Sequence, residues 1–268
     1  MCAMVCLVLL FTPGASALEQ IRFGSVAMEI PAVMHERLMP LAEYLEGELK
    51  TQVSLYLSHD MPAAVKAVAE NRVQVSYLTP LAYIRAKEAG NVRLVVKTVT
   101  RGRSSFRLVI VVKQLSPIKK IADLAGKSFA FGDSTALLQR AVVEGAGIEI
   151  ERFAEFHFLD HHDNVARGVL NGDFDAGIIK ESLISRQHEN ALRVLYRSPK
   201  LPPYVIVVSR NVPDKTYRAI RAAFLKLSDD YPGHLRIIKT LDKNYTGFAT
   251  VDDGEYDVVR RLIAPFNK

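Results

Sequence analysis

The chain has 268 residues, of which 49% are hydrophobic, so it is long and apolar enough for one large domain or for two lobes of ordinary size. Its formal net charge is +6, but the Lys and Arg residues are scattered without a compact basic run. This distribution argues against a nucleic-acid-binding surface and favours a mild field that attracts small anions. Both cysteines, Cys2 and Cys6, lie at the start of the chain, so we expect neither a disulfide nor a cysteine-ligated metal beyond them.

Residues 1–17 are predicted to be a cleavable signal peptide. Residues 4–11 form an apolar core, residues 12–14 (Thr-Pro-Gly) break it, and residues 15–17 (Ala-Ser-Ala) fit a small-x-small cleavage site. The usual positive charges before the apolar core are missing. An uncleaved membrane anchor is the alternative, but the run is too short to span a bilayer. We therefore expect export of a mature chain that begins at Leu18.

Strand and helix signals alternate along the rest of the chain, which predicts a mostly parallel α/β fold. In the first hundred residues we expect strands at 21–26, 53–57, 73–77 and 92–98, and helices at 33–49, 62–70 and 80–89. Later helices are expected at 214–228 and 254–263.

Two long β-branched runs, 106–113 and 204–209, bracket a self-contained α/β segment. This arrangement predicts two crossover strands that form a hinge between two lobes. Residues 18–108 together with 205–268 would form the first lobe, and residues 109–204 the second. A ligand would then bind between the lobes.

The inserted segment carries two candidate binding elements. In the first, a strand at 128–131 leads through Gly-Asp-Ser-Thr to a helix at 136–144, whose free backbone N–H groups could face an anion. In the second, residues 155–181 read as strand, helix and strand. This β-α-β unit places His162 and Glu181 at the carboxyl edge of the sheet, where open α/β sheets bind ligands.

The chain resembles the phosphate/phosphite/phosphonate-binding periplasmic proteins of ABC importers, which have the type II solute-binding fold. The matching segments are 21–24 (Ile-Arg-Phe-Gly), 40–45 (Pro-Leu-Ala-Glu-Tyr-Leu), 72–83, 123–127 (Asp-Leu-Ala-Gly-Lys) and, most specifically, 162–177. The resemblance implies a non-enzymatic periplasmic protein. We expect a monomer without a cofactor or metal. It also implies an ABC permease in the inner membrane as the partner.

The resemblance also implies which residues hold the ligand. Hydroxyl and N–H groups at a helix start map to Ser134 and Thr135, and a second-lobe histidine maps to His162. Hydroxyl or aromatic residues of the first lobe map to Thr79 and Tyr83. Glu181 matches an acidic residue that holds a ligand amine in some members.

This sequence departs from the family pattern at three places. Ala136 and Leu137 replace a serine and a glycine at the helix start, Phe106 stands where the family tends to have tyrosine, and Gln74 replaces a common aspartate. The first change removes two hydrogen-bond donors, each worth about 1.5–3 kcal/mol to a charged ligand. The pocket is therefore less suited to a bare tetrahedral oxyanion.

Each candidate also has an ordinary structural interpretation. Ser134 and Thr135 can be simple helix caps, as can Thr79. His162 can be a surface residue at a helix start, Glu181 with the preceding Lys180 can be a solvated helix start, and Tyr83 can be core. His161 and His162 point about 100° apart on a helix and make a poor metal-chelating pair.

Three alternative functions remain open at this point. One is a ligand that is larger or more apolar than phosphonate, because Phe106, Leu108, Leu137 and Leu138 are apolar. Another is a ligand sensor that reports to a membrane kinase. The most remote is a serine esterase with Ser134 as its nucleophile, but that block lies in mid-chain and Asp230 precedes His234 by four positions rather than three.

Overall fold

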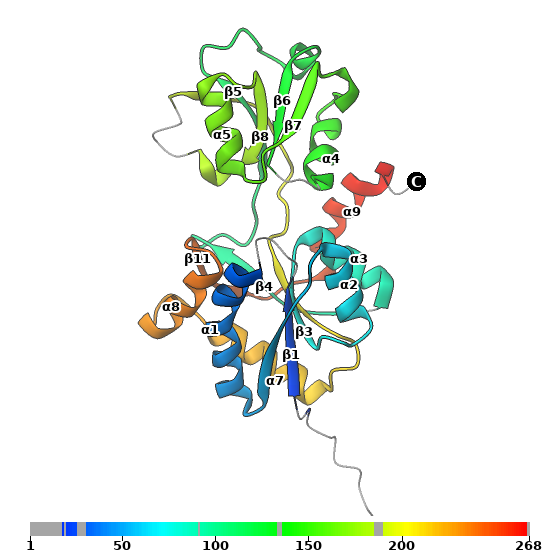
Figure 1. Cartoon of the computed structure of the whole chain (residues 1–268), viewed down its shortest axis with the longest axis vertical. Helices are drawn as coiled ribbons and strands as arrows, with labels where there is room; N and C mark the ends of the chain where they lie inside the picture. The colour runs from blue at the N-terminus through cyan, green and yellow to red at the C-terminus, as the bar shows by residue number, and fades with distance from the viewer. Residues whose placement is uncertain are drawn as a thin grey trace, which may run out of the picture.

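The computed structural model describes residues 18, 20–25, 31–90, 92–132, 136–184 and 190–266. The signal peptide predicted at 1–17 lies outside the described residues. Figure 1 shows two lobes, each built around its own β-sheet and joined by two extended segments. None of the helices in the described ranges is both long and apolar enough to cross a membrane.

The first lobe contains a six-stranded sheet. Its strand order is β11 (Tyr245–Ala249), β4 (Arg93–Thr100), β10 (Val205–Val208), β3 (Val75–Leu78), β1 (Gln20–Ser25) and β2 (Gln52–Leu57). The accompanying helices are α1 (Pro31–Leu49), α2 (Met61–Ala69), α3 (Pro80–Gly90), α7 (Asp214–Lys226) and α8 (Pro232–Leu241). Helix α1 buries Met34, Leu38, Leu41 and Leu45, whose helical spacing puts them on one face.

The second lobe contains a five-stranded sheet. Its order is β7 (Glu155–Phe158), β6 (Ser128–Phe131), β8 (Ala176–Lys180), β5 (Leu108–Lys113) and β9 (Leu192–Arg197), with helices α4 (Leu137–Gly145) and α5 (His162–Asn171). Helix α5 buries Val165 and Val169 and ends at Gly172, which has a left-handed φ of 91°. Glycine suits this helix end because it has no Cβ to clash there.

The sheets are mixed rather than mostly parallel, which corrects the sequence-based expectation. Within the described ranges, β1 pairs in parallel with β2 and β3, and β6 pairs in parallel with β7 and β8. Every pairing that involves β5, β10 or β11 is antiparallel. The reason is topological, because β5 and β10 enter their sheets from the other lobe and run opposite to the strands of the β-α-β units.

The two segments that connect the lobes are held together by hydrogen bonds. The backbone N–H of Phe106 donates to the carbonyl of Leu201 at 2.9 Å, and the N–H of Leu201 donates back at 2.8 Å. The hydroxyl of Ser198 accepts from the N–H of Leu108 at 3.0 Å. The lobe boundaries predicted at 108/109 and 204/205 fall at the start of β5 and just before β10.

Helix α9 (Asp257–Ile263) packs against both lobes, touching α3 of the first and α4 of the second. Figure 1 shows it beside α4, between the two sheets. Its buried residues Val259 and Ile263 belong to an apolar cluster that also includes Leu81 of α3 and Val142 of α4. The apolar core therefore continues from one lobe to the other on this side of the molecule.

Candidate functional site

His162 is the first residue of α5 and is partly exposed. The end of β6 lies directly against it, because a Cβ built on Gly132 would come within 2.9 Å of His162 Nδ1 and 3.1 Å of its backbone nitrogen. Only glycine permits this approach without a shift. The imidazole is thus held where β6 ends and α5 begins, at the carboxyl edge of the second sheet.

The predicted anion-binding residues Ser134 and Thr135 lie outside the described residues. The ends of their connection are defined, however. The side chain of Gln139 on α4 is buried, and its Oε1 accepts from the N–H of Gly132 at 2.9 Å. This bond ties the end of β6 to the first turn of α4.

Thr79 follows β3 in the first lobe and is partly exposed. Its Oγ1 accepts from the N–H of Ala82 at 3.1 Å, as a helix cap does. The hydroxyl proton is not used by this bond, so the group can cap α3 and still donate to a ligand.

Glu181 follows β8 and is joined to two other elements. Its Oε1 accepts from Arg197 Nε at 2.8 Å, and its backbone N–H donates to the carbonyl of Arg107 at 2.9 Å. The Arg197 side chain is 58% exposed, so the ion pair is solvated and contributes little to stability. Glu181 therefore lies beside the connecting segments in this structure.

Tyr83 differs from Thr79, His162 and Glu181 because it is completely buried. Its side chain is 0% exposed, its ring lies 4.5 Å from the ring of Tyr256, and its hydroxyl donates to the carboxylate of Asp253. Burial, followed by the bond to Asp253, raises the pKa of Tyr83 above its ordinary value of 10.0. These contacts give the side chain a structural role in the first lobe, and its contact with a ligand stays a prediction.

Lys180 is a candidate that the sequence does not reveal, since its position there fits a solvated helix start. It ends β8, and its ammonium lies 5.7 Å from the ring centre of Phe106 and 5.6 Å from that of Tyr204. Tyr204 in turn stacks on Tyr77 of β3 with 5.2 Å between ring centres. Burial lowers the pKa of Lys180, against the opposing effects of Asp242 and Asp163.

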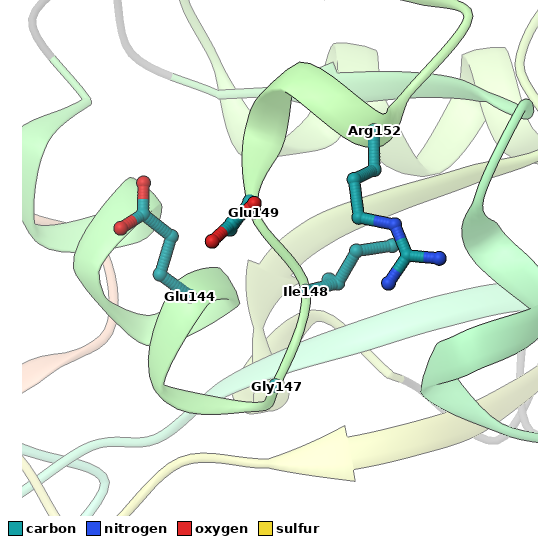
Figure 2. A pocket seen from close by; sticks show the side chains of 5 residues that line it. All are labelled: Glu144, Gly147, Ile148, Glu149 and Arg152. Atoms are coloured by element: carbon teal, nitrogen blue, oxygen red, sulfur yellow. The ribbon is translucent and has the colours of Figure 1, made fainter.

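A surface depression elsewhere in the second lobe is a poor candidate. Figure 2 shows that it is lined by Glu144, Gly147, Ile148, Glu149 and Arg152 at the end of α4. Burial and the charge of Glu151 raise the pKa of Glu144. A lining that already crowds carboxylates disfavours an anion, and none of the predicted site residues belongs to it.

Neither metal binding nor the esterase interpretation gains support from the geometry. In the ranges that the structure describes, no three His, Cys, Asp or Glu side chains gather in a way that could hold a metal ion. The esterase would need His234 as its base. His234 lies on α8, and its ring centre is 5.8 Å from that of Tyr44 and 5.2 Å from that of Tyr231.

Two sheet-based lobes, two crossover segments and candidate residues at the carboxyl ends of strands in both lobes define a type II solute-binding protein. A family model described as ABC transporter, phosphonate, periplasmic substrate-binding protein matches residues 23–256, and the chain belongs to this family. The resemblance and the two-lobe type II fold inferred from the sequence are thereby confirmed, whereas the prediction of mostly parallel sheets is wrong.

Individual relatives are distant. The phosphonates-binding periplasmic protein of Escherichia coli is 24% identical over 224 residues, which cover 77% of this chain and 66% of that protein, just under two thirds of its length. The structure of PhnD1 from Prochlorococcus marinus with methylphosphonate is 19% identical, with a TM-score of 0.75 over 93% of this chain and 99% of that one. XAC2383 from Xanthomonas citri, bound to ATP, is 18% identical, with a TM-score of 0.76 over 92% and 96%. These two likenesses show the fold.

Proposed function

We propose that the protein binds a small oxyanion of the phosphonate or phosphate type between its lobes and presents it to an ABC permease in the inner membrane. The observation that carries this proposal is the position of His162, held against Gly132 at the carboxyl edge of the second sheet. The family assignment and the phosphonate named for two relatives support the choice of ligand.

His162 and the first turn of α5 would supply hydrogen-bond donors and the positive end of the helix dipole. Thr79 would donate from the first lobe, and Ser134 and Thr135 would add hydroxyls if they act as the family resemblance implies. A ligand that touches both lobes favours the closed state, because its contacts are complete only there. No covalent step is needed, and we propose that the protein is not an enzyme.

We propose further that residues 1–17 direct export and are removed, and that the mature protein acts in the periplasm as a monomer without a cofactor or metal. A mass measurement of the mature protein would test the cleavage directly. A chain that begins at Leu18 would support this proposal, and a mature chain that retains residues 1–17 would contradict it.

Replacing His162 with alanine is expected to weaken methylphosphonate binding more than tenfold, because a donor to a charged group is lost. Calorimetry on the full mature chain measures this change. His161→Ala is the matched control, since His161 is an adjacent, exposed histidine. Equal affinity of the His162 variant and the wild-type protein would remove His162 from the site.

The affinity for the anion is also expected to fall as salt is added, since exposed charges are screened over about 8 Å at physiological ionic strength. Titrations of phosphate and methylphosphonate at low and high salt measure this dependence. An affinity that does not change with salt would instead favour the second candidate function, a larger and more apolar ligand. Phe106 and Tyr204, which are both partly exposed, provide the aromatic surface that such a ligand needs.

A further inference from the structure

We propose that Lys180 binds the charged group of the ligand, and that the aromatic rings around it favour anions that carry an organic substituent over bare inorganic phosphate. This inference rests on the proposed function and specifies the ligand class that the site accepts.

The position of Lys180 places its ammonium at the junction of the lobes. Lys180 is the last residue of β8 and pairs with Leu108, the first residue of β5. The two rings next to its ammonium belong to the connecting segments, Phe106 on one and Tyr204 on the other. Both ring centres lie within the 6 Å over which a cation is attracted to an aromatic face. The ammonium is therefore held where the lobes meet rather than extended into solvent.

Among the residues that the structure describes, the charge of Lys180 interacts with carboxylates only at long range. In the described part of the chain, no carboxylate forms an ion pair with its ammonium, although Asp242 of the first lobe and Asp163 of the second interact with it electrostatically at longer range. A partly buried cation without a close counter-ion costs free energy, and burial accordingly lowers its pKa. An anionic ligand would supply the missing counter-ion.

Two aromatic rings, those of Phe106 and Tyr204, lie next to the ammonium. Tyr204 stacks on Tyr77 at an interplanar angle of 25°, and Tyr77 is two residues before the predicted ligand residue Thr79. The hydroxyl of Tyr77 is already hydrogen-bonded to that of Tyr245 at 2.7 Å. Tyr77 is buried and supports Tyr204 from behind, whereas Phe106 and Tyr204 are partly exposed. A substituent on the anion can pack on these two rings, and inorganic phosphate has no group that can do so.

A rival role is possible for the same residue. Lys180 could pair with Asp242 when the lobes close, and so act as a latch that stabilises the closed state without touching the ligand. The two roles differ in sign. If Lys180 binds the anion, removing the Asp242 charge strengthens anion binding, whereas removing half of a latch weakens it.

The experiment is calorimetric titration of phosphate, methylphosphonate and phenylphosphonate into the mature wild-type protein and its variants. Lys180→Gln is expected to weaken methylphosphonate binding at least tenfold and to reduce its salt dependence. Lys215→Gln is the matched control, because Lys215 is an exposed lysine on α7 and its loss changes the net charge equally. Asp242→Asn is expected to bind the anions more tightly than wild type. Phe106→Ala is expected to weaken phenylphosphonate more than phosphate.

The outcomes separate the two proposals. If His162→Ala weakens binding and Lys180→Gln does not, the role of Lys180 is wrong and the proposed function stands. If Asp242→Asn weakens binding as much as Lys180→Gln, the latch is correct and the ligand contact is wrong. If the wild-type protein binds none of the three anions, both the proposed function and this inference are overturned. Thermal unfolding of each ligand-free variant shows whether it is folded.

Discussion

Replacing Gly177 with valine is expected to lower the free energy of unfolding by about 3 kcal/mol, at the upper end for overpacked cores. A Cβ at this position would lie 2.4 Å from Val165 Cγ1, 3.2 Å from Val169 Cγ2 and 3.2 Å from the carbonyl oxygen of Ala130. Gly177 is in β8 and the two valines are in α5, so the added atoms would push the helix away from the sheet. Denaturant unfolding followed by circular dichroism measures the loss.

The same substitution is expected to impair ligand binding, since β8 ends in Lys180 and α5 begins with His162. Gly47→Ala in α1 is the control, because a Cβ there meets nothing within 4 Å. That change should be neutral or stabilising by up to about 1 kcal/mol, as alanine favours helix more than glycine does. A Gly177→Val protein as stable as wild type would show that α5 can shift freely on the sheet.

The helix and strand that meet at Gly177 belong to the region that could be predicted best from sequence. The helix after His162 has apolar residues at helical spacing, an asparagine-glycine stop and a following β-branched strand, and all three signals agree. In the structure the helix extends over His162–Asn171 and the strand over Ala176–Lys180. Local signals of this kind are sufficient when each element buries one face against its immediate neighbour in the chain.

Elements with weaker local signals were missed. Strands β9 and β11 lie at the edges of their sheets, and helix α8 follows a turn that was not recognised as a helix start. Edge position alone does not explain these misses, because the edge strands β2 and β7 lie where the sequence predicts strands. The antiparallel entry of β5 and β10 and the contact of α9 with both lobes depend on residues far apart in the chain. Periodicity cannot report such contacts.

In the candidate site, too, the residues with local signals could be predicted and those with neighbours far away in the chain could not. His162 and Glu181 could be placed at a strand edge because each follows its strand directly. Lys180 reads from the sequence as part of a solvated helix start, since its neighbours Phe106 and Tyr204 come from two separate connecting segments. Tyr83 could not be assigned either way, because a tyrosine on an apolar helix face fits both a core and a ligand site.

Replacing Asp253 with alanine is the second change with a large expected effect. It should lower the free energy of unfolding by about 2 kcal/mol, because the buried hydroxyl of Tyr83 loses its acceptor. Asp253 Oδ1 accepts from the Tyr83 hydroxyl and, at 2.5 Å, from Arg260 Nη2. These bonds join α3 to the start of the C-terminal segment that contains α9. Tyr83→Phe removes one of the bonds but leaves no buried polar group unpaired on Tyr83, so its cost should be smaller.

The dependence on pH has a definite sign. Burial alone would raise the pKa of Asp253, but the bonds from Tyr83 and Arg260 outweigh it and the pKa lies below its ordinary 3.8. A carboxyl with a lowered folded pKa stabilises the protein at pH above 3.8, and this contribution is lost as the pH falls through the folded pKa. Wild type should therefore lose more stability than Asp253→Asn between neutral pH and about pH 3.

Tyr83→Phe separates the structural role of this residue from the ligand contact predicted for it. Because the side chain is fully buried and bonded to Asp253, we expect a lower free energy of unfolding and a methylphosphonate affinity within about twofold of wild type. Denaturant unfolding and calorimetry on the same sample provide both measurements. A tenfold loss of affinity with unchanged stability would instead place the Tyr83 hydroxyl at the ligand, and would mean that α3 rearranges when the lobes close.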